Sequence, residues 1–203
     1  MNDTGVRLMN KQLMAVALAT AAVIAAPAHA TDVALAADGG WNEFDVDSFL
    51  AQDFGNGWID ESDGSALHFT FTIAQGSVGT LAIVDAGFAG DTFTVTNGGA
   101  TLGSTSAVPA GNVDGSLEFD FDAALANPAY SHGVFKLGAG TYSIGGSLLQ
   151  SVLDDSGAAL DATNGALRLS VSAIPEPSSS ALMLGGFAAL ALLARRRKSG
   201  NAI

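Results

Sequence analysis

The chain of 203 residues contains no cysteine. This absence excludes disulfide bonds, thiol catalysis and zinc sites built from thiolates. In an oxidising compartment such a protein is held together by its core alone. Aromatic residues are also scarce at 7% of the chain. Gly, Ser, Thr, Ala and Asp dominate instead, a composition that favours a turn-rich, all-β fold.

Positive charges are almost missing from the middle of the chain. Between residues 31 and 173 the only cations are Lys136 and Arg168, against 15 Asp and three Glu, which gives a net charge of −16. The whole chain carries −12, so this middle part is the more acidic. Such a field repels nucleic acid, and repels anionic polysaccharide unless divalent cations bridge the charges. Nucleic acid is therefore excluded as a partner.

The patterns of common catalytic sites are missing as well. The chain has no Gly-x-Ser-x-Gly motif, no phosphate-binding glycine loop and no zinc-type spacing of Cys and His. Only His68 and His132 are available for chemistry outside the N-terminal segment, and their geometry cannot be inferred from spacing. With so many acids some carboxylate pair is inevitable, so a pair does not indicate glycoside hydrolysis. We expect a protein that is not an enzyme and that needs no cofactor, with a structural Ca²⁺ as the one exception to consider.

The first 30 residues have the pattern of a secretory signal peptide. Two cations precede an apolar stretch over residues 13–26. Ala28 and Ala30 then supply the small side chains that signal peptidase requires before its cleavage site. We expect signal peptidase to act on the chain and the mature protein to begin at Thr31.

Three elements follow one another at the C-terminus: a Pro-Glu-Pro sequence, an apolar run over residues 181–194, and four cations at 195–198. The two prolines keep the backbone around the glutamate extended. The apolar run, with the serines before it, makes a helix of about 25 Å, shorter than the ~30 Å hydrocarbon core and suited to a temporary anchor. Cations directly after it indicate a cytoplasmic end. The residues assigned to sorting are Pro175, Glu176, Pro177, Arg195, Arg196 and Arg197.

Residues 174–198 resemble the PEP-CTERM sorting signal. The resemblance implies a Gram-negative bacterium that makes exopolysaccharide, and processing by the membrane enzyme exosortase. It also implies export through the inner membrane, transient anchoring by a single transmembrane helix over about residues 178–194, and a final place at the cell surface or in the extracellular matrix. The tail itself says nothing about what the folded part does.

The residues between the two targeting segments predict one domain. We divide the chain into a signal peptide (1–30), a folded body (31–173) and a sorting tail (174–203). Residues 67–73 alternate strictly between apolar and polar, the period of a half-buried strand. Asn97-Gly98 favours a hairpin turn, and residues 120–127 favour one short helix. Further strands are expected at 80–84, 93–95, 100–103, 133–137, 141–144 and 166–171. This density of short strands indicates an all-β fold, a β-sandwich of jelly-roll type.

Residues 66–145 also resemble a block found in secreted bacterial β-rich proteins, many of which carry the same sorting tail. The residues that carry the likeness are 80–85, 90–93, 102–106, 131–135 and 137–140. The resemblance implies a fold and a compartment, and no activity.

Acids and glycines gather between residues 45 and 64. Loop carboxylates of this kind could bind Ca²⁺, which takes six to eight oxygen ligands. The spacing does not match an EF-hand, and the alternative is a solvated acidic surface that keeps the protein soluble. The candidate ligands are Asp45, Asp47, Asp53, Asp60 and Asp63.

Two further pairs of residues allow competing interpretations. Asp85 and Asp91 flank glycines, so we expect them to shape a turn, with a structural ion as the alternative. Trp41 and Trp58 could stack on a sugar ring or could seal the core near the start of the domain.

Taken together, these features predict a non-catalytic component of the cell surface or of the exopolysaccharide matrix, with polysaccharide as a potential partner. Two alternatives remain open. One is a secreted enzyme that acts on polysaccharide, and the other is a calcium-dependent carbohydrate-binding module.

Overall fold

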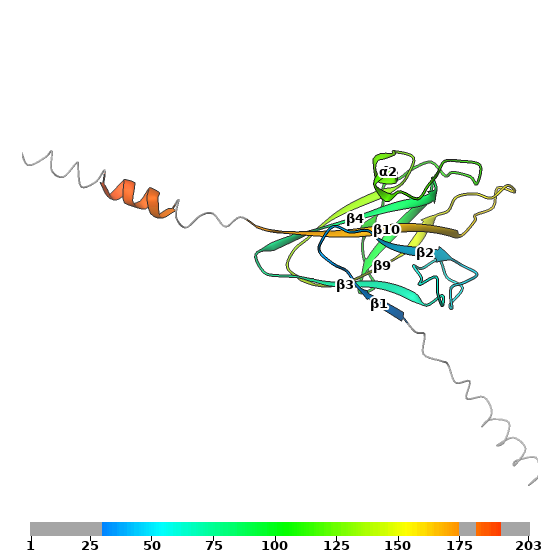
Figure 1. Cartoon of the computed structure of the whole chain (residues 1–203), viewed down its shortest axis with the longest axis horizontal. Coiled ribbons are helices and arrows are strands. Elements are labelled where there is room, and N and C mark those ends of the chain that lie inside the picture. The colour runs from blue at the N-terminus through cyan, green and yellow to red at the C-terminus, as the bar shows by residue number, and fades with distance from the viewer. Residues whose placement is uncertain (1–29, 175–181, 192–203) are drawn as a thin grey trace, which may run out of the picture.

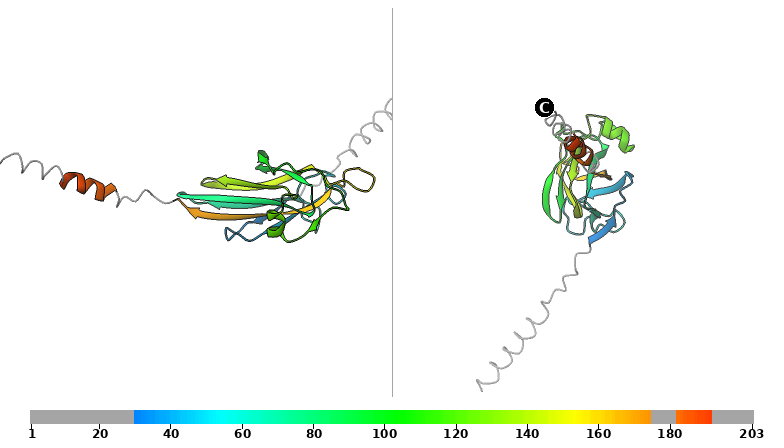
Figure 2. Two further views of the ribbon diagram at one scale, coloured as in Figure 1. Left: turned by 90° about the horizontal axis from the view of Figure 1, so that it is seen from above. Right: turned by 90° about the vertical axis from the view of Figure 1, so that its left-hand side faces the viewer.

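The computed structural model describes residues 30–174 and 182–191. In the first of these ranges the chain forms strands that run along the long axis of an elongated body (Figures 1 and 2), with one short helix. The strands are β1 (Ala30–Ala34), β2 (Asn42–Asp47), β3 (Ala66–Ile73), β4 (Ser77–Phe88), β5 (Thr92–Asn97), β6 (Ala100–Ser104), β7 (Leu117–Glu118), β8 (His132–Leu137), β9 (Gly140–Gln150) and β10 (Ala162–Ala173), and the helix is α2 (Phe121–Ala126).

The strands make two sheets. One has the order β1-β3-β9-β5-β6, and the other has the order β2-β10-β4-β7, with β8 also paired to β4. All of these pairings are antiparallel except the parallel pair β1–β3. The expected all-β class is therefore confirmed, whereas the jelly-roll type of connection stays a prediction.

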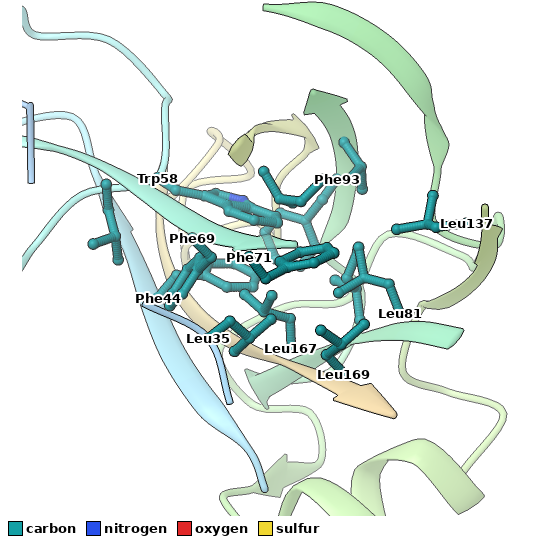
Figure 3. Packing of buried hydrophobic residues seen from close by; sticks show 14 of the residues in the cluster. Leu35, Phe44, Trp58, Phe69, Phe71, Leu81, Phe93, Leu137, Leu167 and Leu169 are labelled. Atoms are coloured by element: carbon teal, nitrogen blue, oxygen red, sulfur yellow. The ribbon is translucent and has the colours of Figure 1, made fainter. Parts of the chain in front are cut away.

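Alternation along the strands builds the core between the sheets. In β3 the odd-numbered residues from Leu67 to Ile73 are buried, and the residues between them face outward or are half-buried. Across from them lie buried aliphatic side chains of β4 and β10. The largest buried ring, Trp58, stacks on Phe44 with 3.9 Å between ring centroids (Figure 3). Gly146 of β9 permits this, because a Cβ at that position would collide with the indole of Trp58.

The expected hairpin turn and the expected helix are both found, and residues close by in the sequence determine each of them. Gly98 and Gly99, with φ of 54° and 82°, turn the chain from β5 into β6. These left-handed values favour glycine at both positions. Asp120 caps α2 by accepting hydrogen bonds from the backbone N–H groups of Asp122 and Ala123. The helix expected at residues 120–127 is thus found at 121–126.

The two ends of the body differ in charge. The end from which the chain leaves β10, here called the tail end, carries the β3–β4, β5–β6 and β8–β9 turns, and these contain no charged residue. The opposite end, here called the distal end, carries the loops 48–65, 105–116 and 151–161 (Figure 1). The acids in these three loops are Asp53, Asp60, Glu61, Asp63, Asp114, Asp154, Asp155 and Asp161.

Candidate functional site

Most of the residues assigned to sorting or to signal-peptide cleavage fall outside the described part of the chain. Ala30 is the exception: it is the first residue of β1 and pairs with Ala66 of β3. Cleavage after Ala30 would leave Thr31, whose hydroxyl lies 2.8 Å from the hydroxyl of Ser65, at the start of the mature sheet. The residues outside the described ranges are Ala28, Pro175, Glu176, Pro177, Arg195, Arg196 and Arg197.

The predicted transmembrane helix is not supported. Within the described ranges, no helix is long and apolar enough to span a bilayer. The part of the expected span that is described, residues 182–191, is helical, and ten residues rise only about 15 Å. The remaining residues of the span, 178–181 and 192–194, lie outside the described ranges.

A hollow of about 430 Å³ opens at the distal end, here called the distal hollow. Asp45 of β2 pairs in register with Asn164 of β10, and both line the hollow. Loop 48–65 contributes Leu50 and Glu61 on one side, and the β7 segment contributes Leu117 and Phe119 on the other. β2 aims its acids here because Phe44 and Val46, which alternate with them, point into the core.

Asp45 is the most perturbed acid of the distal hollow. Burial, followed by the negative charges of Glu61, Glu43 and Asp60, raises its pKa from 3.8 to about 6. Glu43 also lines the hollow and lies outside the acidic stretch in which calcium ligands were expected, whereas Glu61 belongs to that stretch. The alternation of Glu43, Asp45 and Asp47 with buried residues was the signal that could have placed them on one strand face.

The other four expected calcium ligands shape turns. Asp47 accepts hydrogen bonds from the N–H groups of residues 49 and 50, and Asp53 accepts one from Gly55. Asp60 accepts from the N–H and hydroxyl of residue 62, and Asp63 from the N–H of residue 65. Such short-range bonds are typical of Asp in loops. In the described part of the chain, no group of three or more His, Cys, Asp or Glu is placed to hold a metal ion.

Calcium binding at these acids is untested, and melting experiments decide between it and a solvated acidic surface. An ion that binds only the folded protein raises its melting temperature by mass action. Because the carboxylates sit in separate turns, we expect millimolar Ca²⁺ and Mg²⁺ at equal ionic strength to produce equal shifts, through screening of acidic self-repulsion. A clearly larger shift with Ca²⁺, lost in Asp60→Asn but not in Asp114→Asn, would contradict this expectation and establish a calcium site.

Asp85 and Asp91 are buried rather than exposed turn residues. Asp85 Oδ2 accepts a hydrogen bond from the N–H of Gly90 at 3.3 Å, and its Oδ1 has no partner among the described residues. Asp91 Oδ1 accepts one from the N–H of Val152 at 2.7 Å. Burial, reinforced by the charge of Asp91, raises the pKa of Asp85 to about 9, and burial raises that of Asp91 to about 6. The expected turn does exist, since Gly87 and Gly90 both have positive φ.

The tryptophans take the structural role. Trp58 is buried between the sheets, and Trp41 lies under the guanidinium of Arg168, 4.3 Å from ring centroid to Cζ. Arg168 also donates a hydrogen bond to Asp122 at 2.8 Å, so this cation is engaged on α2. Trp58 has no exposed face for a sugar, and Arg168 covers one face of Trp41. The exposed rings of the distal end are instead Phe49, Phe54 and Phe119.

The two histidines lie on different elements. His68 of β3 lies opposite Asp32 of β1, with Nδ1 and Oδ1 3.8 Å apart. His132 opens β8, and its Nδ1 is buried without a hydrogen-bond partner in the described part of the chain. Neither lines the distal hollow.

Comparison with known proteins identifies the tail. The PEP-CTERM protein-sorting motif is found at residues 173–198, which confirms the resemblance drawn from the sequence. The motif marks an exported protein that exosortase processes and that is anchored transiently in the membrane before display at the cell surface. Among curated proteins nothing matches.

Among solved structures, the pre-peptidase C-terminal domain of a collagenase from Bacillus anthracis is similar. The two share 10% sequence identity with a TM-score of 0.36, over 71% of this chain and 97% of that chain. At this level the similarity carries no conclusion about what the body does.

Proposed function

We propose that the chain is a non-catalytic component of the cell surface, or of the exopolysaccharide matrix, of a Gram-negative bacterium. Signal peptidase removes the N-terminal segment and exosortase processes the tail. The β-sandwich is then the part of the protein that functions outside the cell. The finer elements of this proposal, a matrix role and polysaccharide as partner, go beyond the sorting motif and rest on the arguments below.

The junction between body and tail is the observation that carries the proposal. β10 ends at Ala173, which is also the first residue of the sorting motif. The next residue, Ile174, still donates a hydrogen bond from its N–H to the carbonyl of Gly76. All the strands in the described part of the chain end at or before Ala173, so removal of the residues after Ile174 leaves both sheets and the core whole. The acidic distal end then points away from the point of attachment.

A fractionation experiment tests the proposal. In wild-type cells the protein recovered from the cell surface or the medium is expected to begin at Thr31 and to lack the C-terminal segment. Intact-mass spectrometry measures both ends at once, and a periplasmic marker protein controls for leakage. Recovery of surface material that still carries residues 195–203 would show a permanent anchor and would refute processing.

One observation favours the enzyme as a second candidate. Asp45, with its pKa near 6, lies among carboxylates in a hollow, an environment that suits a general acid in glycoside hydrolysis. Release of reducing sugar from polysaccharide by the purified protein, abolished in Asp45→Asn, would favour this candidate over a non-catalytic component.

A further inference from the structure

Several apolar side chains of the distal hollow are exposed to solvent. Their exposure does not stabilise the fold of an isolated domain. Phe119 is 62% exposed, Leu117 54% and Leu50 52%, and all three line the hollow. Phe88 at the end of β4 lines it as well and is half-buried. Apolar surface that gathers around a concave site, with polar groups beside it, is characteristic of binding sites.

Carboxylates line the same hollow, and none of its described lining residues is a cation. Glu43, Asp45, Asp47 and Glu61 all contribute to its surface. The two cations of the body are engaged elsewhere. Lys136 donates a hydrogen bond to the hydroxyl of Thr80, in the half of β4 nearer the tail end, and Arg168 is held between Asp122 and Trp41. A concave acidic site of this kind attracts positively charged ligands.

Size and shape narrow the choice of ligand. A hollow of about 430 Å³ is at the small end of ligand sites, and it is too small to seat an α-helix, whose diameter with side chains is about 10–12 Å. The exposed apolar side chains suit a flat, partly apolar ring, and Asn164 and the carboxylates that line the hollow can accept hydrogen bonds from donors of the ligand. A pyranose ring with an ammonium group combines a flat apolar face, hydroxyl donors and a positive charge.

We propose that the distal hollow binds a sugar chain that carries free amino groups, with Phe119 stacking on a ring face and Asp45, Glu43 and Glu61 holding the ammonium and hydroxyl groups. This proposal deepens the proposed function by naming a ligand. It rests on that function only for the compartment that the protein and the sugar chain share. The distal hollow lies at the end of the body opposite the tail. Anchoring through the tail would therefore leave the hollow open to ligands.

Calorimetric titration with defined oligosaccharides tests this proposal. The protein is purified from whichever cell fraction contains it, so the result does not depend on where it is displayed. The probes are a glucosamine tetramer, its fully N-acetylated form and a neutral glucose tetramer. We expect the glucosamine tetramer to bind at least about tenfold more tightly than the other two probes. We expect its affinity to fall as salt is added. Equal affinity for the three, or no binding of the glucosamine tetramer at millimolar concentration, would overturn the proposal.

Paired variants locate the site. Phe119→Ala and Asp45→Asn are each expected to weaken binding of the glucosamine tetramer about tenfold, the order expected for loss of one aromatic or charged contact. Phe54→Ala and Asp114→Asn are the matched controls, since both residues are exposed at the distal end and neither lines the hollow. Melting curves establish that each variant is folded. The site would be refuted if the control variants weakened binding as much as the site variants. It would also be refuted if a tetralysine peptide bound as tightly as the glucosamine tetramer and its affinity did not change in Phe119→Ala, because binding would then reflect general acidity.

Discussion

Lowering the pH from about 8 to about 5 is expected to stabilise the mature protein against unfolding by several kcal/mol. The cause is the buried carboxyl of Asp85, whose pKa rises from 3.8 to about 9 on folding, with smaller contributions from Asp91 and Asp45 at about 6. A carboxyl with a raised pKa favours the folded state when it is protonated. Its contribution is complete below about pH 4 and is lost progressively as the pH rises towards 9, at about 1.4 kcal/mol per pH unit.

Asp85→Asn isolates this effect. The amide keeps an oxygen acceptor for the N–H of Gly90 and carries no charge, so the variant should unfold less readily than wild type at pH 8 and about equally at pH 4. Asp114→Asn removes the same charge from an exposed loop and serves as the control. Urea unfolding at a series of pH values gives the measurement. A wild-type stability that does not fall between pH 5 and 8, or a variant less stable than wild type at pH 8, would show that Asp85 is held as a carboxylate.

Substitution within the Pro-Glu-Pro sequence is expected to stop processing almost completely. Exosortase processes proteins that carry this motif, and Pro175, Glu176 and Pro177 lie within it. Glu176→Ala or Pro177→Ala should therefore leave an unprocessed form in the inner membrane and remove the protein from the surface fraction. Immunoblots of the fractions, with intact masses of the bands, measure both changes.

Ser179→Ala provides the matched control, because it lies in the same segment but outside the Pro-Glu-Pro sequence. It should leave processing and display at wild-type levels. A Glu176→Ala protein found at the surface with its normal shortened mass would mean that the enzyme reads the apolar and basic parts of the tail alone.

A strand could be predicted from the sequence where apolar and polar residues alternate along it and no other pattern competes with the alternation. β3 was expected at residues 67–73 and found at 66–73, and the Asn97-Gly98-Gly99 turn between β5 and β6 was expected where it occurs. α2 was predictable because its cap and its following proline are local features. In each case the residues that decide the structure lie within a few positions of one another.

β1 and β2 were not predicted, for a physical reason. β1 is short and its pairing with β3 joins residues more than thirty positions apart, so nothing local marks it. In β2 the alternation of Phe44 and Val46 with acids is present, but the acids drew the interpretation towards a metal-binding loop. The distal hollow could not be predicted for the same reason, since the long-range pairing of β2, β10, β4 and β7 is what brings Asp45, Asn164 and Phe119 to one hollow.

The position of β10 has a mechanical consequence. It is the last strand before the tail, it pairs with β4 along most of its length, and it pairs with β2 over its first half. A pull applied at Ala173 runs parallel to this strand, so the hydrogen bonds to both neighbours are loaded together in shear instead of opening one at a time. A force between the tail end and a ligand held at the distal end therefore loads the body along β10, the direction in which it resists best.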